Sequence, residues 1–505
     1  MRSVTKVIYK PDSQSTEEYT VIVDPSEKWK AGDTTIPLTE VVDSMSSAVE
    51  INVPVARELC LPLENAKKCG RCGRTSTESL KVCSGCAQIA YCGPDCQKRD
   101  WKTHKRSCGE TDRIELGSFY PLIAFIMELQ RNDPFKPSHR ALGHQIVNSP
   151  NPWDEESVVR LPDGSASRLI ILGDEMLFPT MGPAPQDWWP TALSDQVRQK
   201  LRRRFQSENF LLPSIISVLF ALMAEMYTTT STVNPSDGAK RRARLSYYGS
   251  PIADFGIAKG QANVKHQDHF TYLFLNHGMA FEKGQDPNDH YWIYFTTVGG
   301  QDVVLDCGLF VFNHPIFVVP FPHYAKYIPS SWPGITTLGV PAYFPPREAI
   351  KRGVLPRVHD ERQRFSVLRD EGLKEAIRFS HDGFRPTDEE AITNFMERVA
   401  GHACEEIEEA IAIKWCEEAC EVVGKNLQNR EYLNYPKTDE VGHAVSEDPG
   451  DREQSALVPA NELDEGWMKC LKKWNGKHRR GDINEQQLRE ALQAYKAKDQ
   501  RRKRQ

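Results

Sequence analysis

The sequence predicts a multidomain α+β protein, in which a small two-zinc module precedes a larger mixed α/β domain and a helical C-terminal region. Three features predict this arrangement. Cysteines and one histidine crowd into residues 69–108, strand-like and helix-like runs alternate through residues 115–380, and an alanine- and glutamate-rich segment covers residues 386–427. With 505 residues, the chain is long enough for several domains and a sizeable core.

The composition and the start of the chain indicate where the protein resides. The net charge of −5 is not that of a general nucleic-acid binder, so we do not expect nucleic acid as a partner. The start, MRSVTKVIYKPDSQ, lacks the apolar segment of a signal peptide. The longest apolar run, Phe210 to Met226, is short and interrupted, which favours a buried helix over a membrane span. We therefore expect a protein of the cytoplasm or nucleus without a membrane partner, where disulfides do not persist and clustered cysteines predict metal.

Residues 69–108 have the ligand spacing of two tetrahedral zinc sites. Two cysteines separated by two residues form a tight knuckle in which both thiolates reach one ion. Separation by three residues puts both ligands on one face of a helix, which we expect over DCQKRDWKTHKRSC. Four protein ligands for each Zn²⁺ ion leave no open position, so we expect both ions to be structural. The eight predicted ligands are Cys69, Cys72, Cys83, Cys86, Cys92, Cys96, His104 and Cys108.

The same segment resembles the MYND zinc finger, and the chain as a whole resembles MYND-containing proteins of fungi. Besides the eight ligands, the resemblance rests on Tyr91, Gln97 and Trp101. It implies a crossed pairing of the ligands. It also implies that Gln97 and Trp101 line a groove for a proline-rich peptide of a partner protein; the alternative is that Trp101 packs in the small core. In the implied pairing one ion is held by Cys69, Cys72, Cys92 and Cys96, and the other by Cys83, Cys86, His104 and Cys108.

Two strand-like runs open the chain, Val4 to Tyr9 and Glu18 to Val23, joined by the polar turn PDSQST. They predict a β-hairpin, and a short helix is expected near Leu38 to Val42. Residues 4–44 weakly resemble the N-terminal half of a fungal Shwachman–Bodian–Diamond-type domain. Residues 1–60 are therefore interpreted either as a truncated domain or as an unrelated hairpin, and no functional residue is assigned in them.

The middle region contains a second hairpin signal, HYWIYFTTVGGQDVVLDCGLFVF, which turns at Gly299 and Gly300. His290 opens one strand and Asp306 ends the other, which resembles the histidine and aspartate of transglutaminase-like and papain-like enzymes. No cysteine lies between Cys108 and Cys307 to act as the nucleophile. We interpret the segment as an ordinary buried hairpin, and an active or degenerate enzyme in residues 250–320 is the alternative.

A methyltransferase is the other enzyme class to consider, because MYND fingers occur within SET-domain lysine methyltransferases. The Asn-His-Ser-Cys-x-Pro-Asn type of motif of those enzymes is missing. Neither Asn276-His277 nor Asn313-His314 is followed by the required cysteine and Pro-Asn pair. A phosphate-binding glycine loop and a Gly-x-Ser-x-Gly elbow are also missing. We expect no enzymatic activity and assign no catalytic residue.

The C-terminal third is predicted to be helical over residues 388–426, with a break at Gly401. A polar linker and a last helix with the basic tail RRKRQ follow, and this tail is the basis for a nucleic-acid-associated regulator as an alternative. The function expected is that of a zinc-binding protein-interaction module, an adaptor or regulatory protein. The predicted parts of the chain are 1–60, 69–108, 115–380, 386–427, 428–465 and 466–505.

Overall fold

The structure, a computed structural model, divides the chain into two units, Met1–Arg57 and Glu58–Gln505. After residue 442 the structure describes only single residues and adjacent pairs, so most of the predicted last helix and the basic tail fall outside the described residues. The residues described are 2–10, 15–23, 57, 59, 68–75, 80–83, 86, 89–108, 111–152, 157–161, 164–177, 183–228, 242–276, 278, 280–319, 339–378, 380, 383–439, 441–442, 473, 474, 477, 487, 490, 491, 494 and 495.

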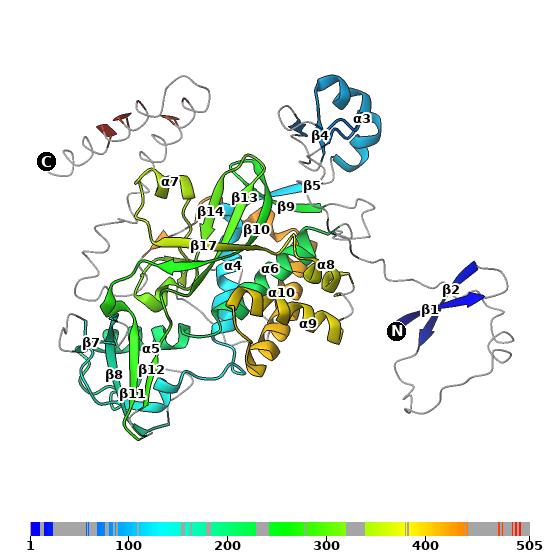
Figure 1. The fold of residues 1–505 in the computed structure, drawn as a ribbon. Helices are drawn as coiled ribbons and strands as arrows, with labels where there is room; N and C mark the ends of the chain where they lie inside the picture. The colour runs from blue at the N-terminus through cyan, green and yellow to red at the C-terminus, as the bar shows by residue number, and fades with distance from the viewer. Residues whose placement is uncertain are drawn as a thin grey trace. The chain divides into compact units, whose positions relative to one another are not determined.

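The first unit contains an antiparallel hairpin of β1 (Arg2–Lys10) and β2 (Ser15–Val23), shown at the blue end of the chain in Figure 1. This confirms the two strands predicted for the start of the chain. The short helix expected near residues 38–42 falls outside the described residues.

The second unit is organised around a sheet of six strands. Within the described residues the strand order is β14-β13-β10-β9-β5, with β17 also paired to β10 (Figure 1). The long strand β10 is antiparallel to β13 along one edge and to β17 along the other. The strands are β5 (Thr111–Glu115), β9 (Arg242–Tyr247), β10 (Ser250–Ala262), β13 (His290–Thr297), β14 (Asp302–Leu305) and β17 (His359–Ser366).

Glycines in β10 allow β17 to approach closely. A Cβ atom on Gly256 would lie 2.0 Å from the carbonyl oxygen of Phe365, and one on Gly260 would lie 2.1 Å from that of Asp360. Both obstacles are backbone atoms, so no side-chain movement relieves the clash. The pairing also shifts register between Lys259 and Gly260. This register shift is a β-bulge, and together with the two close contacts it determines the register of β17 against β10.

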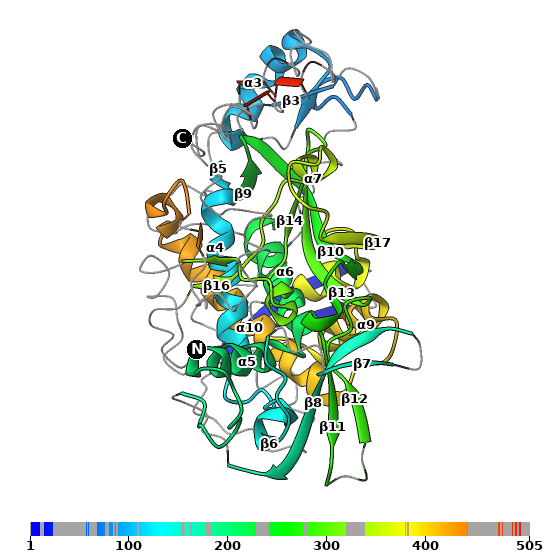
Figure 2. The ribbon, with the colours of Figure 1, turned by 90° about the vertical axis from the view of Figure 1, so that its left-hand side faces the viewer.

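Helices pack on one face of this sheet and form the main core (Figure 2). Alternate residues of β13, Tyr291, Ile293 and Phe295, point into this core, as the period of two in a strand requires. The most buried helix is α6, whose residues are all buried except Glu225, which confirms the buried helix predicted from Phe210 to Met226. The helices are α4 (Leu116–Arg131), α6 (Leu211–Met226), α8 (Glu371–Ile377), α9 (Pro386–Ala400) and α10 (Glu406–Gln428).

The other predicted elements of this core are also confirmed. The hairpin at Gly299 and Gly300 is β13 and β14, paired antiparallel. The predicted break at Gly401 separates α9 from α10, and Gly401 has φ +82, a left-handed conformation that favours glycine at a helix end. The apolar segment SFYPLIAFIMELQR forms most of α4.

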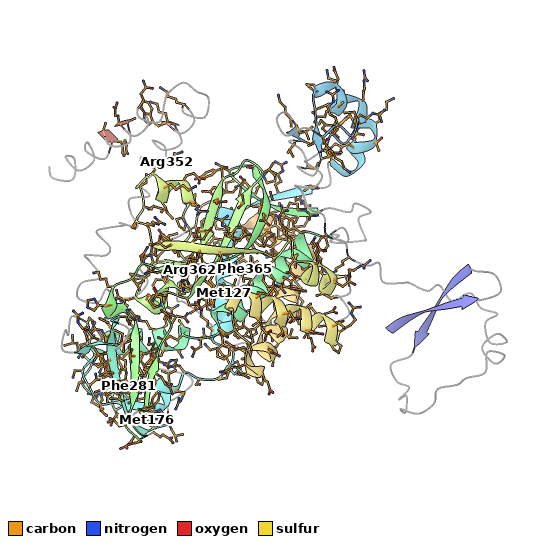
Figure 3. The ribbon with its side chains drawn as sticks, viewed as in Figure 1. Met127, Met176, Phe281, Arg352, Arg362 and Phe365 are labelled. Atoms are coloured by element: carbon orange, nitrogen blue, oxygen red, sulfur yellow. The ribbon has the colours of Figure 1, made fainter. Side chains whose placement is uncertain are left out.

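A second sheet of the described chain has the order β12-β11-β8-β6, with β7 paired to β8. Its core contains Trp188, Trp189 and Phe205. Phe281 of the edge strand β12 and Met176, which follows β8, lie at the outer end of this sheet (Figure 3). The strands are β6 (His144–Ile146), β7 (Val158–Arg160), β8 (Ala166–Glu175), β11 (Phe270–Phe274) and β12 (Ala280–Lys283).

The basic segment DQVRQKLRRRFQS forms α5 (Asp195–Ser207), and most of its basic residues are buried. Arg198 donates to the carbonyl of Trp189 at 3.2 Å, and Arg204 donates to that of Val311 at 2.9 Å. Arg203 donates to Glu128 at 3.0 Å. These cations therefore bind loops and neighbouring helices together, rather than presenting a basic surface.

Shorter elements complete the described chain. A small sheet consists of β15 (Phe317–Val318), β16 (Val340–Pro341) and β18 (Val441–Gly442). A further short helix is α7 (Arg347–Lys351). The 3-10 helices are η1 (Arg140–Gly143), η4 (His266–Asp268), η5 (Leu309–Phe312) and η8 (Glu431–Asn434). No helix of the described residues can cross a membrane alone by length and apolar character; only α5 and α6 taken together, bent by 64°, pass that test.

We predict that Gly256→Ala destabilises the second unit by about 1–3 kcal/mol, because the added methyl group overlaps the backbone of β17. Urea unfolding followed by tryptophan fluorescence measures the loss. Gly117→Ala on α4 is the control, because nothing lies within 4 Å of its added Cβ atom. Equal unfolding midpoints for the Gly256→Ala variant and the wild-type protein would show that the two strands are not in close contact.

Asp133, just past the end of α4, joins this helix to α10 and makes stability depend on pH. It accepts from Trp415 Nε1 at 2.7 Å and from Lys414. Burial raises the pKa of Asp133, but the hydrogen bonds from Lys414 and the Phe135 amide more than offset this, so the pKa lies below its usual value. Such a carboxylate stabilises the folded state above the unfolded pKa of about 3.9, and that contribution is lost as the pH falls through the folded pKa.

Asp133→Asn should therefore lower the free energy of unfolding by about 1–3 kcal/mol at pH 7, and the difference from wild type should shrink as the pH falls below about 4. Urea titrations at several pH values measure both effects. Glu417→Gln, at an exposed position of α10, is the control for the loss of one negative charge. A difference that stays constant down to pH 3 would contradict the proposed linkage.

Candidate metal centre

Residues 68–108 fold around two loops that carry cysteine pairs, a short hairpin and one helix. The hairpin strands are β3 (Lys81–Val82) and β4 (Ala90–Tyr91), and the helix is α3 (Pro94–Cys108). Both loops are hydrogen-bonded beside β4: the Gly70 amide donates to Ala90 at 2.8 Å, and the Cys83 amide donates to Ile89 at 2.8 Å. The backbone thus holds both cysteine pairs beside β4, where the first pair faces the start of α3 and the second pair faces its end.

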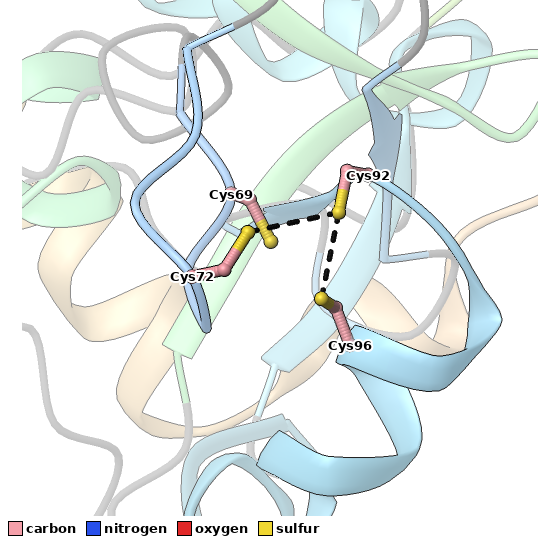
Figure 4. A group of neighbouring side chains, drawn as sticks. All are labelled: Cys69, Cys72, Cys92 and Cys96. Carbon is pink, nitrogen blue, oxygen red and sulfur yellow. Dashed lines mark hydrogen bonds between the residues drawn. The ribbon is translucent and has the colours of Figure 1, made fainter.

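The first group of ligands consists of Cys69, Cys72, Cys92 and Cys96 (Figure 4). The sulfur atoms of Cys72 and Cys92 lie 3.7 Å apart, and those of Cys92 and Cys96 lie 3.4 Å apart. In Figure 4 the four sulfur atoms point toward a common centre from the first loop, from the end of β4 and from the first turn of α3.

The second group consists of Cys83, Cys86, His104 and Cys108, all buried. His104 Nε2 lies 3.4 Å from Cys83 Sγ and 3.5 Å from Cys86 Sγ, and the sulfur atoms of Cys83 and Cys108 are 3.6 Å apart. His104 and Cys108 lie one turn apart on α3, as their spacing predicts. The two groups alternate along the sequence, which is the crossed arrangement that the resemblance implied.

These separations fit two zinc ions. Tetrahedral Zn²⁺ with Zn–S bonds of about 2.3 Å holds its sulfur ligands about 3.8 Å apart, and a sulfur and an imidazole nitrogen about 3.6 Å apart. The separations between ligand atoms in both groups come close to these values. Each group provides four ligands, so both ions are fully coordinated by protein and have a structural role.

The thiols of each group can all be thiolates only beside a cation. Burial and the neighbouring Cys83 raise the pKa of the Cys108 thiol to about 12, and the neighbouring Cys92 and burial raise that of Cys96 to about 12. Thiols so close together cannot all ionise at neutral pH without a compensating positive charge. A zinc ion supplies that charge in each group, so formation of the finger is coupled to binding of the metal.

One detail of the predicted ligand geometry is wrong. We expected Cys92 and Cys96 to lie on one helix face, but α3 begins at Pro94, and Cys92 directly follows strand β4. Gly93 and Pro94 lie between the strand and the helix body, so the chain turns between the two ligands. Spacing by three residues fits both a helix and a strand-to-helix turn, and the proline at the helix start selects the turn.

The two residues implied in peptide binding have different surroundings. Gln97 donates from Nε2 to Cys83 Sγ at 3.9 Å, so it supports a zinc ligand directly. Trp101 is 43% exposed and meets the ring of His104 edge-on, with centroids 6.0 Å apart. The small apolar core contains Tyr91, whose hydroxyl donates to Asp100 at 2.7 Å, but not Trp101.

Comparison with known proteins agrees with this geometry. The model of the MYND finger family matches residues 68–108. These residues are a MYND finger. The finger therefore holds two zinc ions and is a protein-interaction module, as predicted for this segment.

Similarity to known proteins covers short stretches. Protein CBFA2T2 of Xenopus laevis is 39% identical over 86 residues, which are 17% of this chain and 14% of that protein. The human CBFA2T2 is 45% identical over 47 residues, 9% of this chain and 7% of that protein. Histone-lysine N-methyltransferase ASHR1 of Arabidopsis thaliana is 41% identical over 58 residues, 11% of this chain and 12% of that protein. No solved structure matches the chain.

The other predicted pair, His290 and Asp306, is brought together in the main sheet. His290 Nε2 and Asp306 Oδ2 are 2.7 Å apart. The third member is His359, whose Nε2 lies 2.6 Å from the same oxygen. Cys307 points into the main core, where burial raises the pKa of its thiol to about 12, so it is a poor nucleophile. Sequence reasoning missed His359, which is 53 residues beyond Asp306 and shares no motif with it.

Removal of one zinc ligand provides the first test of the finger. We predict that Cys92→Ala releases one zinc ion from the purified chain and unfolds the finger, because loss of one thiolate weakens zinc binding and cuts the link between β4 and the other ligands of the first group. Zinc by mass spectrometry and hydrogen exchange across residues 68–108 measure the two effects. Cys420→Ala on α10 is the matched control, since this cysteine lies outside both groups. Unchanged zinc content in Cys92→Ala would remove Cys92 from the ligand set.

Proposed function

We propose that the protein acts as an adaptor or regulatory protein, which docks a peptide of a partner on the exposed face of α3 in its MYND finger. The observation that carries this proposal is the exposure of Trp101. An exposed tryptophan beside a rigid, metal-fixed core provides a flat apolar surface for proline rings, and it loses little conformational entropy on binding.

The neighbours of Trp101 on α3 indicate the chemistry of the peptide. Gln97, Lys98 and Lys105 precede or follow Trp101 by three or four residues, so they share its helix face. Lys98 and Lys105 are exposed. A proline-rich peptide with acidic residues beside its prolines would match this surface, with prolines on Trp101 and carboxylates beside the lysines.

We further propose that the chain does not work as an enzyme. Both zinc ions of the finger have four protein ligands, and Cys307 is unsuited to act as a nucleophile beside His290. The methyltransferase of Arabidopsis thaliana is 41% identical to this chain over 58 residues, 12% of its own length, and so short a match does not carry its named activity to this chain. The zinc thiolates favour the reducing environment of the cytoplasm or nucleus.

We predict that Trp101→Ala weakens binding of a proline-rich, acidic peptide by about tenfold or more, as is usual for a central tryptophan of an interface. Fluorescence anisotropy with labelled peptides measures the affinity, and zinc content shows that the finger is intact. Lys102→Ala is the control, because this exposed residue points about 100° away from Trp101 around the helix. Equal affinities of the Trp101→Ala variant and the wild-type protein would place docking elsewhere.

A further inference from the structure

His290, Asp306 and His359 form a third cluster of side chains that can bind metal, and it lies within the main sheet. His290 is the first residue of β13, Asp306 directly follows β14, and His359 is the first residue of β17. Strand β10 lies between the two histidine-bearing strands, with Gly260 opposite His290 and Ala262 opposite His359. His290 is therefore next to Asp306 on neighbouring strands, and His359 reaches Asp306 from the far side of β10, past two small residues.

The carboxylate of Asp306 is held in a fixed orientation. Its Oδ1 atom accepts from the amide of Gly308 at 2.7 Å and from that of Leu309 at 3.2 Å. Oδ2 is left to face both histidines, at 2.7 Å from His290 and 2.6 Å from His359. Outer hydrogen bonds that fix the orientation of a carboxylate ligand are typical of metal sites in proteins.

The group lies inside the protein, away from bulk water. The side chains of His290 and Asp306 are fully buried, and that of His359 is 5% exposed. The group is therefore a buried carboxylate with an imidazole nitrogen on either side.

Unpartnered polar atoms gather around this cluster. Within the described chain, His290 Nδ1, His359 Nδ1, Trp292 Nε1 and the Tyr343 hydroxyl are buried without a hydrogen-bond partner. The ring of His359 lies 4.4 Å from that of Trp292 and 5.9 Å from that of Tyr343, between centroids. A folded protein rarely leaves buried polar atoms unpaired, and several in one place indicate bound water, such as water that completes the coordination of an ion.

We propose that His290, Asp306 and His359 bind one divalent first-row transition metal ion through Nε2, Oδ2 and Nε2. These three ligand atoms lie within 4.8 Å of one another. Neighbouring ligands about 2.1 Å from an ion are about 3 Å apart in octahedral geometry and about 3.4 Å apart in tetrahedral geometry, so the N–O separations of 2.6 and 2.7 Å widen by about 0.3 to 0.8 Å when an ion binds. Two imidazoles and one carboxylate suit Zn²⁺ and Fe²⁺.

The ion has a structural role in this proposal. Its ligands come from β13, the end of β14 and β17, so it fastens strands on both sides of β10. The side chains are closed to solvent, which excludes a substrate in this conformation. The remaining coordination positions are filled by water, which can hydrogen-bond to the hydroxyl of Tyr343.

The competing interpretation is a purely hydrogen-bonded triad, in which both imidazoles donate their Nε2–H groups to Asp306. His359→Gln separates the two interpretations. The amide nitrogen of glutamine can donate to Asp306 in place of His359 Nε2, but neither this nitrogen nor the amide oxygen replaces imidazole as a strong ligand of such a metal ion. This variant therefore preserves a hydrogen-bonded triad and destroys a metal site.

The test uses the full chain, equilibrated with excess Zn²⁺, or with Fe²⁺ under anaerobic conditions, and then freed of unbound metal. Mass spectrometry should find three metal ions for each wild-type chain, two from the finger and one from this site. His359→Gln should retain two. His314→Gln should retain three, because this histidine neighbours Tyr343, with ring centroids 5.1 Å apart, but is no member of the cluster.

Two ions for the wild-type chain in both the zinc and the iron experiments would overturn the proposal, as would three ions in His359→Gln. If His359→Gln does not fold, judged by circular dichroism, the wild-type chain loaded with Co²⁺ decides the question. A cobalt ion in this site has no sulfur ligand, so it adds visible absorption without the thiolate charge-transfer bands of the finger. The proposal would also be overturned if the Co²⁺-loaded chain showed only the absorption of the thiolate-bound ions of the finger.

Discussion

The pairing of β10 on both of its edges is the constraint on which the second unit depends. One edge binds β13 and the other binds β17, and β17 can approach only because Gly256 and Gly260 have no Cβ atom. That close approach places the first residues of β13 and β17 over the same end of β10. The main core forms on one face of this sheet, and the cluster around Asp306 forms on the other.

The finger is stabilised in a different way from this sheet. Its described apolar core consists mainly of the zinc ligands themselves with Tyr91, Leu80 and Ile89. Metal coordination therefore replaces the large apolar core that holds α4, α6 and α10 to the main sheet. Because the zinc ions fix the backbone of the finger, its helix can leave Trp101 exposed without loss of structure.

Much of this architecture could be predicted from local sequence. The hairpin at Gly299 and Gly300, the buried helix α6 and the division of α9 from α10 at Gly401 follow from turn residues, apolar runs and helix-ending signals. The character of α5 could not be read in this way. Most of its basic residues are buried, and the partners of Arg203 and Arg204, which are Glu128 and the carbonyl of Val311, come from segments 75 and 107 residues away.

The sequence by itself determined the finger, because its ligands are close along the chain and zinc accepts only certain ligand types and spacings. It also brought His290 and Asp306 together through one hairpin. Only the tertiary structure decided that His359 is their third partner and that Cys307 points away into the core. The reason is physical: His359 arrives on a strand paired across β10, and such long-range pairing leaves no periodic mark in the sequence.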